Sequence, residues 1–510
     1  MFQRSILLGS VAALSIACAV SVRAAVPTDS TNLRNAVTVG GIRAHQQTLQ
    51  DIADANGGTR ASGTPGFDAS AEYVAGVLTA AGFAVSQQEF EFPFFQELAP
   101  AEFRQVSPDA IEYGPADFTI MEYSGSGDVA ADVAAAGGIQ IPPGPDASSS
   151  SSGCTAADFA GFPSGQVALI QRGTCTFGEK AVNAQAAGAS AVIIFNEGQP
   201  GRQEVLSGTL GGPVVTIPVI GTSFAVGEQL AALVESGVTV EITTSTLSEL
   251  RSTSNVIAES KSGRSDRTVV VGAHLDSVVE GPGINDNGSG TATILEIAAQ
   301  MATLKTRNRV RFALWGAEES GLLGSIYYVE QLSSREIKDI AVNLNFDMLG
   351  SPNFVRYVYD GDGSDTPDAG PNGSATIEDI FLDYFASLQP PLPIEPTAFD
   401  GRSDYGPFIA AGIPAGGLFS GAEEIKTAAQ VALFGGTAGD PLDPCYHQAC
   451  DTFDNNNNEI LDQFGDAAAH AVLQFAMTTS AVNGTSRAND RAVKSVPLDS
   501  LAFRGSHLQK

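Results

Sequence analysis

The stretch Val-Val-Val-Gly-Ala-His-Leu-Asp-Ser at 269–277 is an apolar run that ends in a histidine and an acid. A glycine-rich turn follows at 281–290, and a second apolar run at 310–315 ends in Gly-Ala-Glu-Glu-Ser-Gly at 316–321. Strand patterns alternate with helix patterns through about residue 480, which predicts an α/β fold with a mixed, largely parallel sheet flanked by helices. Ligands bind such sheets at the carboxyl ends of the strands, where these polar residues lie.

Two further apolar segments deliver residues of the same kind. The run at 341–346 leads into an aspartate, and a segment between two cysteines at 445–450 carries a histidine. Imidazole and carboxylate together are ligands suited to Zn²⁺. A catalytic zinc takes three protein ligands and keeps one position open, so five ligands suit two ions if one carboxylate bridges them. The ligand set predicted in this way comprises His274, Asp286, Glu319, Asp347 and His447.

Five motifs give the chain a resemblance to a known family. They are HLDS at 274–277, GINDNGSG at 283–290, GAEESGLLGS at 316–325, NFDMLG at 345–350 and CYHQACD at 445–451. With these motifs the chain resembles the co-catalytic zinc aminopeptidases secreted by bacteria, of the leucyl aminopeptidase type. The resemblance covers roughly residues 40–95 and 250–480 and implies the zinc-exopeptidase fold.

The resemblance also implies a role for each ligand. His274, Asp286 and Asp347 would hold one zinc, while Asp286, Glu319 and His447 would hold the other, so that Asp286 is the bridge. A hydroxide shared by the two ions would attack the peptide carbonyl. The alternative is that the histidines are ordinary structural residues at strand ends.

Two more residues match the catalytic residues of this family. Glu318 matches the general base, and Tyr446 matches the tyrosine that donates a hydrogen bond to the scissile carbonyl oxygen. The alternative for Glu318 and Glu319 is an acidic pair stabilised by the dipole of a helix N-terminus.

The substrate pocket is predicted from weaker matches. Arg402 would contact the main chain of the substrate or product, or alternatively form a surface ion pair, and Phe419 indicates an apolar side-chain site. The family usually has histidine where Tyr405 stands. Asp276 is the right kind of residue to orient the imidazole of His274 with its carboxylate, although a solvated strand end is the alternative.

The N-terminus has the layout of a secretory signal peptide at 1–24, with a basic start, an apolar region and an Ala-x-Ala-like end. The mature chain is therefore expected to be extracellular or periplasmic, without a membrane anchor. Removing Arg4 and Arg23 and no acids moves the formal charge from −30 to −30 − 2 = −32. So acidic a chain is not expected to bind nucleic acid, because phosphate contacts need Lys and Arg. A monomer is expected.

Export leaves four cysteines, and an even number in an oxidising compartment favours disulfides. Local pairing predicts Cys154–Cys175 and Cys445–Cys450, the second of which would clamp the loop that carries Tyr446 and His447. Zinc ligation by these cysteines is the alternative.

Composition divides the mature chain. We expect a catalytic domain in two parts, 31–110 and 249–480, and a tail at 481–510 that is disordered or processed. The segment 111–248 is rich in Ala, Gly, Ser and Val and resembles the mainly β protease-associated domain, inserted to cover the active-site mouth or to bind extended substrates. The alternative is a stability insert without substrate contact.

Asp462 and Asp466, four apart on a probable helix, could bind Ca²⁺, although a solvated helix face is the alternative.

These observations together predict a secreted zinc metallo-aminopeptidase. It would hydrolyse the N-terminal peptide bond of peptides and proteins, with a preference for apolar N-terminal residues. The alternatives are a carboxypeptidase or dipeptidase on the same scaffold, a glutaminyl cyclase with one zinc, and a non-catalytic receptor-like relative. The complete ligand set and Glu318 count against the last two.

Overall fold

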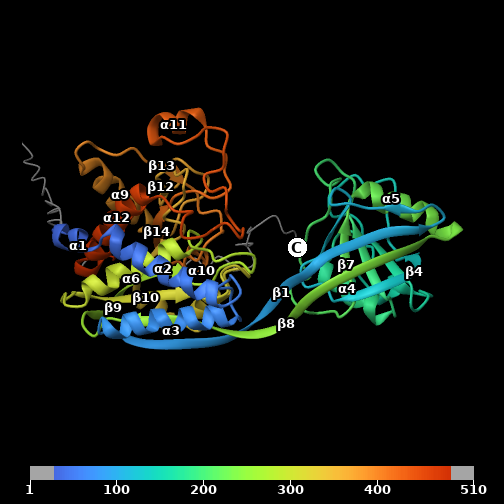
Figure 1. The fold of residues 1–510 in the computed structure, drawn as a ribbon, viewed down its shortest axis with the longest axis horizontal. Helices are drawn as coiled ribbons and strands as arrows, with labels where there is room; N and C mark the ends of the chain where they lie inside the picture. Colours follow the sequence, from blue (N-terminus) through green and yellow to red (C-terminus); the bar gives the residue numbers. More distant parts are fainter. Residues whose placement is uncertain (1–27, 484–510) are drawn as a thin grey trace, which may run out of the picture.

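The computed structural model describes residues 28–483. The expected signal peptide and residues 484–510 of the expected tail lie outside this range. Figure 1 shows two lobes joined by a long two-stranded ribbon. Within residues 28–483, no helix has the length and apolar character needed to cross a bilayer.

Four parallel strands form the centre of the larger lobe. In spatial order they are β14 (Ala415–Phe419), β11 (Ile340–Phe346), β9 (Arg264–His274) and β10 (Asn308–Trp315). Most of their residues are buried, because both faces of the sheet are covered, and this explains their continuous apolar runs. Antiparallel neighbours extend the sheet, so it is mixed and largely parallel as predicted. They are β12 (Tyr357–Tyr359) with its partner β13 (Glu395–Thr397), and β8 (Thr239–Glu259) with its partner β1 (Ala84–Ser107).

Helices cover both faces of this sheet. One face packs against α1 (Thr31–Ala36), α2 (Val39–Ala55), α3 (Pro65–Ala80), α6 (Gly288–Met301), α9 (Ser374–Ser387), α11 (Ala428–Phe434), α12 (Asn458–Met477) and α13 (Ser480–Asn483). The other face packs against α7 (Leu323–Glu330), α8 (Ser334–Asp339) and α10 (Tyr405–Ala410).

The chain enters the larger lobe through two helices, α2 and α3, which are followed by the strand β1. The helix α3 starts at Pro65, because the Thr64 side chain accepts a hydrogen bond from the Phe67 N–H and proline suits the first helical position.

The smaller lobe has a sheet of its own, built on β8. Strands β4 (Gly127–Ala135), β5 (Val167–Gln171), β6 (Ala191–Phe195) and β7 (Val219–Thr222) are parallel neighbours, and β4 pairs antiparallel with β8. The remaining elements of this lobe are β2 (Ile111–Glu112), β3 (Phe118–Ile120), α4 (Phe177–Ala186), α5 (Phe224–Leu233) and the 3-10 helices η1 (Ala156–Phe159) and η2 (Val234–Ser236). Two apolar clusters form its core, separate from the clusters that cover the sheet of the larger lobe.

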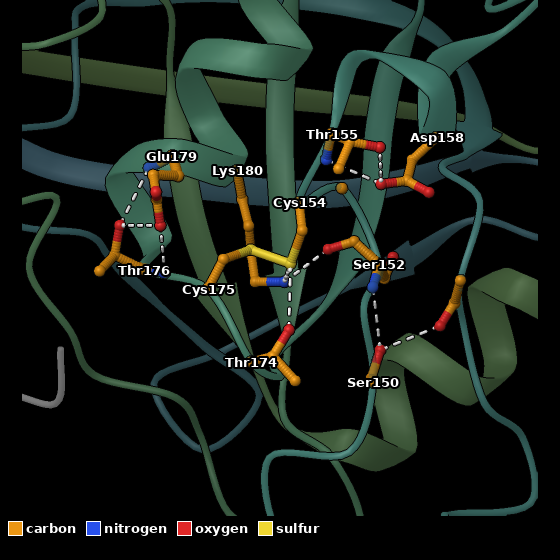
Figure 2. Close-up of a disulfide and its surroundings, with 12 residues drawn as sticks. Ser150, Ser152, Cys154, Thr155, Asp158, Thr174, Cys175, Thr176, Glu179 and Lys180 are labelled. Carbon is orange, nitrogen blue, oxygen red and sulfur yellow. Dashed lines mark hydrogen bonds between the residues drawn. A yellow bond between two sulfur atoms is a disulfide. The ribbon is translucent and has the colours of Figure 1, made fainter.

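Both predicted disulfides are present. Cys154 and Cys175 join the loop before η1 to the loop before α4 in the smaller lobe (Figure 2), and Cys445 and Cys450 close a short loop in the larger lobe. The cysteines are therefore not metal ligands, which removes the alternative of zinc ligation.

Candidate metal centre

The parallel strands bring the predicted ligands to one edge of the sheet. His274 is the last residue of β9, Glu318 and Glu319 follow β10, and Asp347 follows β11. These three strands are adjacent and parallel, so their carboxyl ends meet. Asp286 lies in the turn that leads into α6, whose start is fixed by Asn287: the Asn287 side chain accepts a hydrogen bond from the Gly290 N–H.

His447 reaches the same place from the loop closed by Cys445 and Cys450. Its backbone is left-handed, with φ of 56°, which is uncommon for a residue other than glycine and turns the imidazole toward the sheet edge. The structure thus brings all five predicted ligands together.

Asp286 lies between the two imidazoles and faces each with a different oxygen. Its Oδ1 is 3.2 Å from His274 Nε2, and its Oδ2 is 3.2 Å from His447 Nε2. Asp347 Oδ1 lies 3.3 Å from the same nitrogen of His274, and Glu319 Oε2 lies 3.1 Å from that of His447. The five side chains therefore form two groups of three that share Asp286.

These separations fit zinc. Ligand atoms about 2.0–2.1 Å from a tetrahedral ion stand about 3.3 Å from one another, close to the four distances above. One buried carboxylate oxygen in the cluster, Glu319 Oε1, has no hydrogen-bond partner among the described residues. A buried carboxylate oxygen is costly without a donor or a cation, so the donor set and this unpartnered oxygen suit a pair of divalent ions.

Electrostatics also favour a cation here. Burial raises the pKa of Glu318 well above its ordinary value and the pKa of Glu319 to about 7. Burial alone would lower the pKa of His274, but the carboxylates of Glu318 and Asp347 hold it well above its ordinary value. Burial opposes the ionisation of Asp286, yet hydrogen bonds from the two imidazoles hold its pKa below the usual range. The cluster concentrates negative charge in a buried place that a cation would neutralise.

Glu318 lies beside the ligands rather than among the four close contacts. One of its carboxylate oxygens is within 4.8 Å of ligand atoms of His274 and Asp347. Its side chain is almost fully buried, and its backbone N–H donates to Asp276 Oδ1 at 3.3 Å. This places the predicted general base at the edge of the metal cluster.

Asp276 contacts His274 mainly through its backbone. His274 Nδ1 lies 3.2 Å from the carbonyl oxygen of Asp276 and 3.7 Å from its carboxylate Oδ1. Since the shorter contact is to the carbonyl, the turn that follows β9 itself orients the ring. The carboxylate also anchors the segment that carries Glu318.

A pocket that opens to solvent adjoins the cluster, and the residues that line it all lie between 274 and 447. Phe419 lines it and stacks on Tyr357, with ring centroids 5.8 Å apart. Met348 and Tyr359 add apolar surface to the same wall. Tyr405 stands outside the pocket lining: it is buried against Tyr359, and its hydroxyl donates to Asp400 at 2.7 Å.

Arg402 and Tyr446 contact one another at this pocket. Arg402 Nη2 donates to the Tyr446 hydroxyl at 3.2 Å, and its two terminal nitrogens donate to Glu423 at 2.8 and 3.1 Å. The Tyr446 ring stacks on the imidazole of His447, with centroids 3.8 Å apart. The ion pair expected as the alternative for Arg402 is therefore present, and its partner is Glu423.

Two supporting residues had no role in the sequence analysis. Arg60 is fully buried and donates to the carbonyl oxygens of Leu275, Pro282 and Gly283, which lie beside His274 and in the turn before Asp286. No local pattern could have revealed it, because its partners are more than 200 residues away in the chain. Asp451 accepts hydrogen bonds from the backbone N–H groups of Asn285 and Asp286, both at 2.9 Å. The only sign of Asp451 in the sequence is its place directly after Cys450, as the last residue of the motif at 445–451.

Among the described residues, neither Asp462 nor Asp466, the predicted calcium ligands, belongs to a group of three or more side chains that could hold a metal ion. Asp466 is 3.3 Å from Arg34 Nη1, and it accepts a hydrogen bond from the Tyr384 hydroxyl at 3.3 Å. Arg34 already supplies a positive charge to this carboxylate, and calcium binding here stays a prediction.

Comparisons with known proteins agree with the predicted family. Residues 255–472 match the model of peptidase family M28, and residues 129–230 match the PA domain. An aminopeptidase of Pseudomonas aeruginosa is 44% identical over 86% of this chain and 81% of its own length. Leucine aminopeptidase 2 of Trichophyton equinum is 40% identical over 91% of this chain and 89% of its own. A zinc aminopeptidase from Bacillus subtilis has a similar structure, with a TM-score of 0.54 and 27% identity over 86% of this chain and 94% of that one.

Proposed function

The chain belongs to peptidase family M28 and carries an inserted PA domain, and from this we propose that it is an exported zinc aminopeptidase with a two-ion site. It removes the N-terminal residue of peptides and proteins, with a preference for apolar residues. The observation that carries the proposal is the position of Asp286, whose two oxygens each lie 3.2 Å from a different imidazole. A carboxylate so placed suits a bridge between two ions.

The proposed ligands divide into two sets. His274, Asp286 and Asp347 would hold one zinc, and Asp286, Glu319 and His447 would hold the other. When bound, zinc lowers the pKa of a water and polarises the carbonyl oxygen of the substrate. The zinc named in the description of the Bacillus subtilis structure supports this choice of metal.

In the proposed mechanism Glu318 moves the proton. Its buried carboxylate at the edge of the cluster takes a proton from the attacking water and later gives it to the leaving amine. The Tyr446 hydroxyl donates a hydrogen bond to the substrate carbonyl oxygen as negative charge develops there. The carboxylates at the edge of the cluster can hold the free N-terminal amine, which limits cleavage to the first peptide bond.

The pocket wall supports the proposed preference for apolar N-terminal residues. Phe419, Tyr359 and Met348 line the pocket beside the cluster, and burying an apolar side chain against them is favourable. The relative in Trichophyton equinum is named a leucine aminopeptidase, in agreement with this preference.

We also propose the location and the domain organisation. The signal-peptide layout at 1–24 supports export. The catalytic domain comprises 31–110 and 249–480, and 111–248 is the insert; the match of the PA domain to 129–230 falls inside that insert. We propose that the enzyme is a monomer.

Replacing the general base tests the mechanism. Glu318→Ala should lower kcat for leucine p-nitroanilide by at least about a hundredfold, because a positioned general base contributes about that much or more. Zinc content should stay at two ions per chain, since Glu318 is not a ligand. Glu330→Ala, at the exposed end of α7, is the matched control. Wild-type turnover by Glu318→Ala would show that Glu318 is not the base.

A blocked substrate tests the exopeptidase assignment. An aminopeptidase needs the free amine, so N-acetyl-leucine p-nitroanilide should not be hydrolysed. Release of the C-terminal residue from an N-acetylated peptide would instead favour the carboxypeptidase alternative. A chelator should abolish hydrolysis of the unblocked substrate, and added zinc should restore it.

A further inference from the structure

Most of the hydrogen-bonding capacity of Arg402 is used inside the protein. Its guanidinium donates to both carboxylate oxygens of Glu423, from Nη1 at 2.8 Å and from Nη2 at 3.1 Å. The same Nη2 also donates to the Tyr446 hydroxyl at 3.2 Å. Such a two-point arginine–carboxylate contact fixes the plane of the guanidinium as well as its position. Glu423 therefore holds the guanidinium of Arg402 in the orientation in which it donates to the Tyr446 hydroxyl.

This contact sets the direction of the Tyr446 hydroxyl. A guanidinium has five N–H donors and no acceptor, so the phenol oxygen must be the acceptor in its contact with Arg402. The hydroxyl hydrogen is then left to point elsewhere. Tyr446 lines the same pocket as Asp286 and Glu319, and its ring is held by stacking on His447. The free hydrogen is thus available to a substrate oxygen in the pocket.

We propose that Arg402 is a positioning residue that acts through Tyr446: held by Glu423, it orients the phenol as a hydrogen-bond donor to the substrate carbonyl oxygen. This inference rests on the proposed function of Tyr446 and differs from the sequence prediction, in which Arg402 contacts the substrate main chain. A hydroxyl that accepts a bond from a cation is also a stronger donor, because chained hydrogen bonds polarise one another. The Glu423–Arg402–Tyr446 chain is therefore expected to raise kcat rather than substrate affinity.

A double-mutant cycle tests the inference with leucine p-nitroanilide as the substrate. Tyr446→Phe should lower kcat by about a hundredfold, the loss typical of removing one donor to a developing oxyanion. Arg402→Met should lower kcat by about tenfold with KM within about twofold of wild type, since a misdirected hydroxyl keeps part of its effect. The double variant should be no slower than Tyr446→Phe alone, because two groups that act as one unit are not additive.

Controls separate positioning from damage to the fold. Arg264→Met removes another two-point arginine–carboxylate pair, the one with Asp266, at an exposed place on β9. It should leave kcat and KM unchanged. Zinc content and melting temperature are measured for every variant.

Guanidinium added at millimolar concentration should restore part of the kcat of Arg402→Ala. It should not raise the kcat of the variant that carries both Arg402→Ala and Tyr446→Phe. Glu423→Gln should give a smaller loss of kcat, again only where Tyr446 is present.

The outcomes distinguish this inference from the proposal it rests on. If Tyr446→Phe is as fast as wild type, both the catalytic role of Tyr446 and the inference are wrong. If Tyr446→Phe is slow but Arg402→Met raises KM and its loss multiplies with that of Tyr446→Phe, then Arg402 binds substrate directly. In that case only the inference is overturned. Rescue by guanidinium in the absence of the Tyr446 hydroxyl would overturn it as well.

Discussion

At the scale of single residues, Lys180 is a buried cation held by a carbonyl oxygen and a disulfide sulfur. Its ammonium donates to the Ser152 carbonyl oxygen at 2.5 Å and lies 3.6 Å from Cys154 Sγ (Figure 2). Burial lowers the pKa of Lys180 from 10.5 to about 8, and the charges of Glu197, Asp158 and Glu179 offset only part of that effect. The folded protein therefore holds this proton less tightly than the unfolded chain does.

The lowered pKa of Lys180 predicts a pH dependence of stability. Between pH 8 and 10.5 the unfolded chain binds more protons at this residue, so the free energy of unfolding should rise with pH across that window. The full rise from this group is roughly 3 kcal/mol, from about 1.4 kcal/mol per pKa unit. Lys180→Met lacks this group and should not show the rise. The unfolding free energy of wild type minus that of the variant, measured by urea denaturation at pH 7.5 and at pH 10, should therefore increase with pH by roughly that amount. An unchanged difference would mean that the pKa of Lys180 is ordinary.

That His274, Glu319 and Asp347 lie together could be predicted, because each stands at or just after the end of an apolar run that becomes a strand. The end of such a run is visible in the sequence, and adjacent parallel strands bring their ends together. Arg60 could not be predicted in this way, since a basic residue in a loop gives no local sign of being buried against carbonyl groups. The contact between His274 and Asp276 was also beyond prediction, because the choice between carbonyl and carboxylate depends on the turn geometry.

At the scale of elements, the loop between Cys445 and Cys450 carries Tyr446 and His447, the two side chains for which we propose a catalytic and a metal-binding role, on one short segment. The left-handed backbone of His447, with φ of 56°, is uncommon for a residue with a side chain and needs support from its surroundings. The disulfide supplies one support, and Asp451 supplies another through its bonds to Asn285 and Asp286.

Removing this disulfide should weaken zinc binding at the His447 side. Supporting groups outside the ligand set typically change metal affinity by about 10–100-fold, so Cys445→Ser/Cys450→Ser should bind the second zinc more weakly by about that factor and lose kcat in proportion at limiting zinc. Zinc titration of the apoenzyme measures this. The matched control is Cys154→Ser/Cys175→Ser, whose disulfide lies in the smaller lobe and away from the pocket. Equal zinc affinity in the two double variants would contradict the role given to the loop.

At the scale of the whole molecule, β1 and β8 connect the two lobes as one antiparallel ribbon (Figure 1). The composition change predicted a boundary at 248/249, but β8 runs through that position without a break. A strand shared by two sheets keeps the same alternating pattern on both sides of a boundary, so composition locates the insert but not the point where the chain enters it. The base of the ribbon packs on the larger lobe, where Phe90, Phe92 and Phe94 cluster with Ala317 and Leu247.

The ribbon gives a natural place to remove the insert. Gln96 and Leu247 are directly paired across β1 and β8, so an Asn-Gly turn between them would close a hairpin and keep the apolar cluster at the base of the ribbon. The larger lobe has its own core and contributes every residue that lines the pocket. The shortened enzyme should therefore keep kcat/KM for leucine p-nitroanilide within about tenfold of wild type, since most interactions of such a small substrate lie inside the pocket.

Long peptides with an N-terminal leucine, assayed in competition with the small substrate, measure the role of the insert. A changed preference for length would support a function in covering the mouth of the site or binding extended chains, and an unchanged preference would favour a purely stabilising insert. Loss of turnover on the small substrate, with zinc content and melting behaviour retained, would contradict the independence of the pocket from the smaller lobe.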